Sequence, residues 1–416
     1  MNLRHKSAAA IIFLQIIFIV SAFLLLSLRN GAFDIITLVF GLVLAFYNLM
    51  FFNLLRGAFK HIDRFVVLAA QFLWSMGMVV LYRLDPSYAL KQFICLLLGT
   101  LAMLIVMLLL RKSKDFGRFQ WAFMGITIVL LASTLVLGRT TYGARNWIEI
   151  GFFSFQPSEL AKVFFIVVSS YFLSTRHKLV SFIPYLGFTA FCVILLVVEK
   201  DLGAALLIGL TFLIMFYAAT GRVWLTLGGV GILGVGAFAS YHLFSHVRTR
   251  VEVWRDPWSS YQDQGYQIVQ GLMALASGGL LGAGLGLGMP EAIPARQTDY
   301  IFTVIGEEFG IIVGIMVIAF YLVFIIRGIL IALHTRSVFD ALLVFGCTAM
   351  LSLQSFIIIG GVIKLIPLTG ITLPFVSYGG SSMMSSMIQL GIIEGVAVKN
   401  GLADEAALSM MGGTPQ

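Results

Sequence analysis

The chain of 416 residues is 60% hydrophobic and 11% charged, and its mean hydropathy is +1.00. That much apolar surface exceeds what a water-soluble core buries, so the composition excludes a soluble globule and indicates an all-α polytopic membrane protein. The net charge of +8 indicates membrane topology and attraction to anionic lipids, because no basic tail or aromatic-basic pattern predicts nucleic-acid binding.

Twelve apolar segments, each near the roughly 20 residues that a bilayer requires, predict about twelve transmembrane helices. The first segment lacks a small-residue cleavage site, so we expect a retained helix rather than a signal peptide. The predicted ranges are 8–28, 35–55, 65–82, 89–110, 119–138, 155–174, 182–198, 202–219, 223–243, 300–327, 338–362 and 379–398.

The basic residues of the short links predict the orientation of these helices. Fifteen Lys and Arg residues lie in links on the side of the N-terminus, and seven lie in links on the opposite side. The positive-inside rule then places both termini in the cytoplasm and the long segment 244–299 outside.

Neither a disulfide framework nor a metal site is indicated. Cys95, Cys192 and Cys347 all lie inside apolar segments, and the six histidines are scattered without HExxH or a similar spacing. The sequence therefore names no metal-ligating residue.

A polar cluster follows the fifth predicted helix, where Arg145 lies in the sequence GARNW. Pro157 suits the first turn of the next helix, which places Glu159 and Lys162 one turn apart on one face, where they can pair. Such a pair fits either a neutralised packing contact between helices or a polar floor for an anionic substrate.

The segment 244–299 is a long connection, and such connections are usually functional or disordered. Trp254 and Trp258 indicate an ordered loop at the membrane interface, or an aromatic belt that only anchors helix ends. The alternating glycines at 282–288 match no GxGxxG pattern and no P-loop, so we expect close helix packing or a hinge there.

The stretch 290–310 places Asp299 where this polar segment gives way to an apolar helix, with Arg296 three residues earlier. An ionisable group at the edge of a span is costly, which suggests function. Glu307 lies about 12 Å of helix rise and about 80° of rotation from Asp299, so the two are not neighbours. We expect Glu307 and Glu308 to satisfy hydrogen bonds between helices.

The segment 367–382 is interrupted by Pro and Gly, so it predicts a re-entrant or cavity-lining loop rather than a span. The predicted topology puts six charged residues on the same side of the membrane, which is most simply explained by a polar cavity that opens outward. They are Arg145, Glu159, Lys162, Asp201, Asp299 and Lys364.

Taken together, these motifs resemble the SEDS family of bacterial envelope assembly proteins (FtsW, RodA and SpoVE). The matching sequences run from about Phe65 to the C-terminus: GARNWIEIGFFSFQPSELAK, EKDLGAAL, the WRDPW to GYQ loop with its glycine run, IPARQTDYIFTVIGEEFG and PLTGITLPFVSYGGSS. The chain departs from the family at IPARQTD, where Leu-Pro-Glu-Ala-His-Thr-Asp is more usual. The resemblance implies a ten-helix core at 63–400, preceded by two extra helices at 1–62 and followed by a short tail at 401–416.

The resemblance implies a peptidoglycan glycosyltransferase that polymerises lipid II at the outer face of the bacterial cytoplasmic membrane. Such enzymes commonly act beside a class B penicillin-binding protein. Asp299 matches the family's essential aspartate. An α-linked pyrophosphate donor and a β-linked product require one inverting displacement, so a base and cations for the pyrophosphate suffice. Asp299 is the expected base, and Arg145 and Lys162 are the first expected cations. The remaining substrate-binding candidates are Glu159, Asp201, Arg296, Lys364 and Ser377.

Other interpretations stay open at this point. A divalent Mg²⁺ or Mn²⁺ ion fits the pyrophosphate chemistry, although no ligand cluster marks its site. A lipid II flippase would use the same cavity without chemistry, and a noncatalytic scaffold would tolerate loss of Asp299. A proton-coupled transporter would need neighbouring acidic groups that relay protons. The sequence does not distinguish division, elongation and sporulation.

The two front helices are expected to be peripheral and to serve partner docking or regulation. Deletion of residues 2–60 should then leave the external site assembled. The alternative is that these helices pack against the core and support it.

Overall fold

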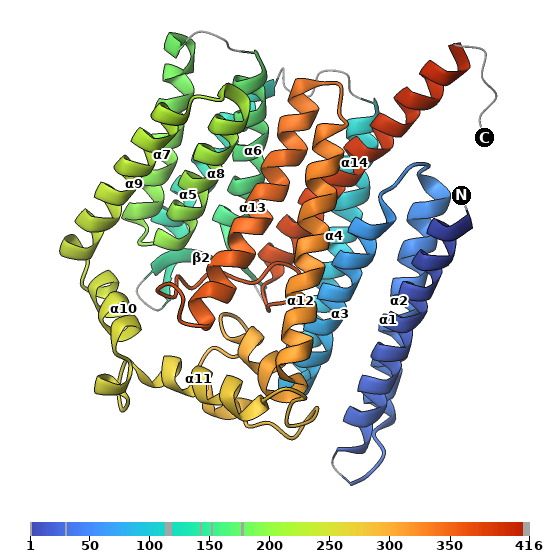
Figure 1. Cartoon of the computed structure of the whole chain (residues 1–416). Coiled ribbons are helices and arrows are strands. Elements are labelled where there is room, and N and C mark those ends of the chain that lie inside the picture. The colour runs from blue at the N-terminus through green and yellow to red at the C-terminus, as the bar shows by residue number, and fades with distance from the viewer. Residues whose placement is uncertain are drawn as a thin grey trace.

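A computed structural model of the chain describes residues 2–29, 31–112, 119–141, 144–150, 153–175 and 179–410. Each of the twelve predicted spans corresponds to a helix in it (Figure 1). These helices are α1 (Asn2–Leu28), α2 (Ile35–Ala58), α3 (Arg64–Leu84), α4 (Pro86–Lys112), α5 (Gln120–Leu137), α6 (Pro157–Thr175), α7 (Ile183–Val198), α8 (Leu202–Thr220), α9 (Val223–Leu243), α12 (Ile301–Leu333), α13 (Val338–Val362) and α14 (Gly380–Met410).

Eleven of these described helices are long and apolar enough to cross a membrane, and α7 is apolar but has only 16 residues. The predicted class, an all-α polytopic membrane protein, is confirmed. Two further helices, α10 (Ser245–Arg255) and α11 (Tyr266–Gly278), lie across one end of the bundle, and both chain termini lie at the other end (Figure 1). We call these ends the loop side and the terminal side.

The sequence did not predict the three short antiparallel strands on the loop side between α5 and α6. They are β1 (Arg139–Thr141), β2 (Ala144–Ile150) and β3 (Phe153–Phe155), in the order β1-β2-β3. Trp147 pairs with Arg139, and Phe155 pairs with Ile148. The sheet places Asn146 and Gln156 next to the start of α8, where both contact Asp201.

The front pair, α1 and α2, packs against α3 through buried polar contacts as well as apolar ones. Asn48 is fully buried; its amide donates to Ser75 Oγ (2.7 Å) and accepts from Trp74 Nε1 (2.8 Å). Gln15 of α1 donates to the carbonyl of Leu68 (2.8 Å). Removal of α1 and α2 would leave such groups without partners, which favours the supporting role over the peripheral one.

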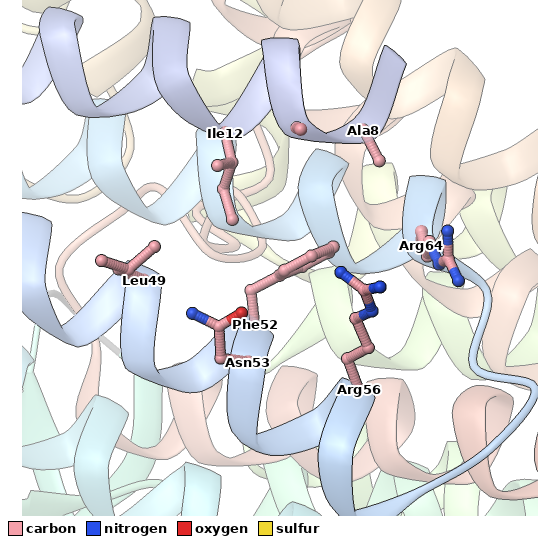
Figure 2. A pocket seen from close by; sticks show the side chains of 8 residues that line it. Ala8, Ile12, Leu49, Phe52, Asn53, Arg56 and Arg64 are labelled. Carbon is pink, nitrogen blue, oxygen red and sulfur yellow. The ribbon is translucent and has the colours of Figure 1, made fainter. Parts of the chain in front are cut away.

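At the terminal side, α1 and α2 separate around a cleft of about 110 Å³ (Figure 2). Small residues of α1, Ala8 and Ala9, leave this space opposite Phe52. The guanidinium groups of Arg56 and Arg64 line the same cleft.

Helix α12 is broken at Gly310, whose φ of 81° and ψ of 173° are not helical. The glycine segment after α11 replaces the lost helical hydrogen bonds: Ala283 N donates to Glu307 O (2.8 Å), and Ile311 N donates to Gly279 O (3.0 Å). A Cβ at Gly282 would lie 2.3 Å from Glu308 O, and the φ of Gly282 is +84°, so only glycine fits. The predicted close packing of the glycine run is confirmed.

The carboxylates of Glu307 and Glu308 are buried beside this segment. Glu308 accepts from Arg83 Nε of α3 (2.8 Å) and from Gly286 N (3.1 Å), and Glu307 accepts from Met289 N (2.9 Å). The expected helix-to-helix contact is therefore present for Glu308, whereas Glu307 binds the loop. Arg83 joins α3, α12 and the glycine segment because its guanidinium also donates to the carbonyl of Gly288 (3.1 Å).

On the terminal side, the range predicted as a tail continues α14 as a helix to Met410. Two ion pairs bind this last part of α14 to the bundle: Lys399 pairs with Asp340 (2.6 Å), and Asp404 pairs with Arg336 (2.9 Å). Asp63, the N-cap residue of α3, pairs with Arg327 of α12. These ion pairs close the end of the bundle that is remote from Asp299.

Candidate active site

Residues 363–379, which we call the buried loop, connect α13 to α14 without helical structure and lie among α3, α4 and α12. Gln92 of α4 donates to Ser377 O and accepts from Gly379 N, both at 3.0 Å. Tyr321 of α12 donates to Pro374 O (2.5 Å). A Cβ at Gly77 of α3 would lie 2.4 Å from Val376 O, so that glycine lets the loop approach. The segment is therefore not a span up to residue 379, as predicted, and the predicted range 367–382 is too long at one end because α14 begins at Gly380.

The buried loop also fixes the backbone just before Asp299. The hydroxyl of Ser377 donates to the carbonyl of Thr298 (2.6 Å) and accepts from Leu373 N (2.9 Å). Tyr378 N donates to Gln297 O (2.8 Å). Ser377 is buried and therefore positions the segment that carries Asp299.

Arg250 of α10 and Asp299 both lie next to Gly370 of the buried loop. Its Nη1 donates to the carbonyl of Thr369 (2.9 Å). A Cβ at Gly370 would lie 3.6 Å from Arg250 Nη2 and 3.7 Å from Asp299 Oδ2, so the guanidinium and the carboxylate border the same glycine. Arg250 is exposed and Asp299 is half-buried, which leaves this pair open at the loop side.

Desolvation raises the pKa of Asp299 to about 6, while the positive charge of Arg250 and a hydrogen bond from Thr298 oppose the rise. The carboxylate is therefore ionised at neutral pH and is a stronger base than an ordinary aspartate. A pKa just below the working pH suits a group that must accept a proton.

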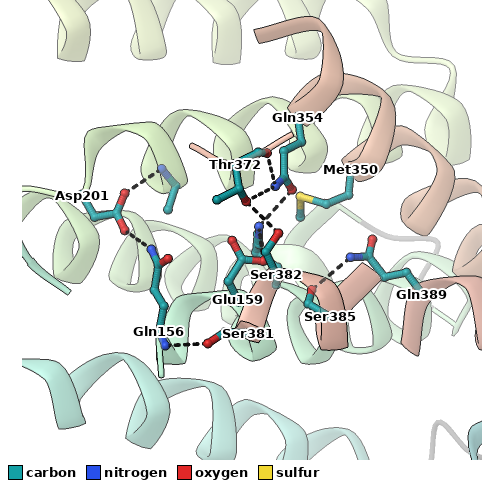
Figure 3. Close-up of polar contacts among 12 residues, drawn as sticks. Gln156, Glu159, Asp201, Met350, Gln354, Thr372, Ser381, Ser382, Ser385 and Gln389 are labelled. Carbon is teal, nitrogen blue, oxygen red and sulfur yellow. Dashed lines mark hydrogen bonds and ion pairs between the residues drawn. The ribbon is translucent and has the colours of Figure 1, made fainter. Parts of the chain in front are cut away.

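Glu159 and Lys162 form the ion pair that their spacing predicts, with Lys162 Nζ 2.9 Å from Glu159 Oε2 and both side chains buried. Lys162 also donates to Gln354 Oε1 of α13 (3.0 Å), and Gln354 donates to Thr372 O in the buried loop (2.9 Å). Thr372 donates in turn to Ser382 of α14 (2.7 Å) (Figure 3). This network connects α6, α13, α14 and the buried loop.

Asp201, the N-cap residue of α8, holds a second network on the loop side. Its Oδ1 accepts from Ala204 N (3.1 Å), and its Oδ2 accepts from Asn146 Nδ2 (3.0 Å) and Gln156 Nε2 (3.1 Å). Gln156 N donates to Ser381 of α14 (2.9 Å), next to Ser382 of the first network (Figure 3). Asp201 therefore joins the strands to the helices that surround the buried loop.

The other candidates lie around this arrangement. Arg296 is half-buried and donates to Glu291 O (3.2 Å), and half-buried Lys364 begins the buried loop with a positive φ of 63°. Arg145 lies in β2 opposite Thr140, and its side chain is outside the described part of the structure. The six predicted charges do not line a single cavity among the described residues. Asp299 lies near Arg250 at Gly370, and two buried networks form around Lys162 and Asp201, all in contact with or adjacent to the buried loop.

Arg250 is the main site residue that the sequence did not single out. It lies on α10 four residues before Trp254, whose Nε1 donates to Lys364 O (3.1 Å). Both side chains thus face the buried loop from adjacent turns of one helix. The spacing of a basic and an aromatic residue in a short amphipathic helix was the available signal, but its partner is about 120 residues away in sequence.

The fold and this site define a multi-pass membrane protein in which a carboxylate and a guanidinium border the same glycine at one end of the bundle. The sequence matches the family model for FtsW, RodA and SpoVE, described as a cell cycle protein, over residues 58–401. The chain therefore belongs to the FtsW/RodA/SpoVE family.

Individual relatives agree with that assignment. The peptidoglycan glycosyltransferase RodA of Mycobacterium leprae is 35% identical over 84% of this chain and 82% of its own length. A probable peptidoglycan glycosyltransferase FtsW of Geobacter metallireducens is 32% identical over 82% of this chain and 96% of its own length. Stage V sporulation protein E of Bacillus subtilis is 31% identical over 80% of this chain and 96% of its own length. The names of these relatives confirm the predicted enzyme class, a glycosyltransferase.

Two solved structures share the fold. A chain from a study of polymerization and crosslinking by a peptidoglycan synthase complex superposes with a TM-score of 0.69 and 27% identity, over 82% of this chain and 98% of that chain. The rod shape determining protein RodA of Thermus thermophilus gives a TM-score of 0.61 and 26% identity, over 81% and 96%.

The Glu159–Lys162 pair leads to a prediction about stability. Lys162→Met or Glu159→Gln alone leaves one buried charge without its partner, which typically costs about 3–5 kcal/mol. The double variant removes both charges and should cost less than the sum of the two single losses. Thermal unfolding of the three purified variants and the wild type gives the coupling, and strictly additive losses would argue against the pair.

Proposed function

We propose that this enzyme polymerises lipid II into peptidoglycan strands, with Asp299 as the base that receives the proton of the acceptor hydroxyl. The names of the relatives support the product, and the environment of Asp299 supports the role. The observation that carries the proposal is an aspartate of raised pKa, held by the buried loop and open beside an exposed guanidinium.

The proposed step is a single inverting displacement. The acceptor oxygen forms a bond to the anomeric carbon of the donor as its proton passes to the carboxylate of Asp299. The bond between that carbon and the pyrophosphate oxygen breaks, and its electron pair leaves with the pyrophosphate. A phosphate leaving group needs no proton, so one base suffices and no covalent intermediate on the enzyme is required.

Arg250 is the proposed contact for the departing pyrophosphate. Its guanidinium is exposed and borders the same glycine as Asp299, and the planar fork of arginine suits bidentate binding to phosphate. Lys162, which the sequence suggested for this role, is buried and paired with Glu159. We therefore assign Lys162 to support of the buried loop through Gln354, and Arg145 remains a proposed second cation.

No step of the proposed mechanism is written through a divalent cation. Among the described residues, no group of three or more His, Cys, Asp or Glu side chains is placed to bind a metal ion. A Mg²⁺ or Mn²⁺ ion at the pyrophosphate stays a proposal, because one or two carboxylates together with the phosphates of the substrate are enough to bind Mg²⁺.

The proposed setting is the outer face of the cytoplasmic membrane, with both termini inside. The excess of basic residues in the links on the terminal side supports this orientation. A class B penicillin-binding protein is the proposed partner, because one structural relative comes from work on the structural coordination of polymerization and crosslinking by a peptidoglycan synthase complex.

Asp299→Asn keeps the size of the side chain but removes its basicity. The variant should lose about 10²–10⁴-fold in rate, the usual contribution of a positioned base. Gel analysis of glycan strands made from labelled lipid II by the purified protein gives the rate. Asp263→Asn, an exposed carboxylate of the same external segment, is the matched control and should retain the wild-type rate.

Wild-type polymerisation by Asp299→Asn would end the base assignment. If the wild-type protein makes no polymer but moves lipid II between the leaflets of a vesicle, the result would instead support the flippase.

The pH dependence of the rate tests the interaction between Arg250 and Asp299. The wild-type rate should fall as pH drops through about 6, because protonated Asp299 accepts no proton. The positive charge of Arg250 lowers the pKa of Asp299, so Arg250→Gln should move this acid limb to higher pH and lose more activity at pH 6 than at pH 8. Exposed Arg248 of the same helix is the control, and Arg248→Gln should leave the limb in place. An unmoved limb in Arg250→Gln would contradict the pairing.

A further inference from the structure

The cleft between α1 and α2 on the terminal side takes no part in the site described above. It is lined by apolar residues of both helices and, at its polar end, by Asn53, Arg56 and Arg64 (Figure 2). An apolar cleft with two cationic groups at one end matches an amphiphile with a negatively charged head. We propose that this cleft binds an anionic phospholipid, with its phosphate at Arg56 and Arg64.

The exposed face of α2 continues the cleft toward the middle of the membrane. Leu42, Phe46, Leu49, Asn53 and Arg56 follow one another at spacings of four and three residues, so they form one stripe along the helix. The first three are apolar and 48%, 64% and 39% exposed. The stripe changes from apolar to polar and then to cationic toward the terminal side, as a lipid changes from acyl chain to phosphate.

The dimensions fit one lipid. Fourteen residues separate Leu42 from Arg56, which corresponds to about 21 Å of helix. One leaflet of the hydrocarbon core is about 15 Å thick, so the stripe spans the acyl region and reaches the headgroup level. Small side chains at Ala8 and Ala9 of α1 leave room beside Phe52, where the first carbons of an acyl chain would lie.

The charges select an anionic head. A basic pocket between transmembrane helices at the level of the headgroups attracts acidic lipids, and each Lys or Arg near the surface contributes about a fivefold preference. Arg56 is exposed at the end of α2, and Arg64 begins α3, so a bound phosphate would join the front pair to the core. The site would then add to the buried polar contacts by which α1 and α2 pack against α3.

Native mass spectrometry of the purified full chain tests the proposal, with phosphatidylglycerol and phosphatidylcholine offered at equal concentration. The wild type should retain phosphatidylglycerol in preference, and Arg56→Gln should lower that preference about fivefold. Arg56→Lys, which keeps the charge, should retain most of it. Arg222→Gln removes an exposed arginine from the same end of the bundle outside the cleft and is the matched control.

Equal retention of the two lipids by the wild type, or an equal loss in Arg56→Gln and Arg222→Gln, would overturn the proposal. Soluble glycerol phosphate distinguishes a lipid site from a simple anion site, since it should not displace the bound lipid. Displacement by glycerol phosphate alone would show that the acyl stripe contributes nothing and would also overturn the proposal. The melting curves of Arg56→Gln and Arg222→Gln should match that of the wild type in lipid-free detergent, because neither arginine side chain is buried.

Discussion

The hydrogen bonds of the buried loop are the constraint on which the rest of the structure depends. Non-helical backbone enclosed in a membrane bundle must find partners within the protein, because lipid offers none. Gln92 of α4 and Tyr321 of α12 supply two of these partners, and Ser377 supplies others within the loop and toward Thr298. The loop is thus held by helices that are distant in sequence, and its shape is fixed before any substrate arrives.

Asp299 lies between two breaks in regular structure, and each break is stabilised separately. Before it, the backbone at Gln297 and Thr298 is bonded to the buried loop. After it, α12 is broken at Gly310, and the glycine segment with Arg83 and Glu308 satisfies the freed groups. The backbone on both sides of Asp299 is therefore anchored, and the carboxylate itself receives a hydrogen bond from Thr298 and lies near Arg250.

Much of this arrangement is predictable from sequence, because the membrane imposes a strong pattern. The positions of all twelve apolar helices, eleven of them long enough to cross a membrane, follow from the apolar segments, and the Glu159–Lys162 pair follows from helical spacing. The prominence of Asp299 follows from the cost of a charge at the edge of a span. The sequence also indicated that the buried loop could not be a helix.

The remaining features depend on contacts between distant residues, which a single sequence does not reveal. Arg250 meets the buried loop about 120 residues further along the chain, and Arg83 meets Glu308 at a separation of 225 residues. The strands β1 and β3 have three residues each, which is too few for a period of two to be evident. Asn48 belongs to no sequence motif, yet its side chain ties α2 to α3.

The central claim is that the buried loop positions Asp299 through the hydroxyl of Ser377. Single-turnover polymerisation of lipid II by Ser377→Ala, measured together with lipid II binding, tests it most directly. If the claim holds, the rate falls by about tenfold to a hundredfold, because the base is displaced, while the affinity for lipid II is unchanged. A wild-type rate in folded Ser377→Ala would contradict the account.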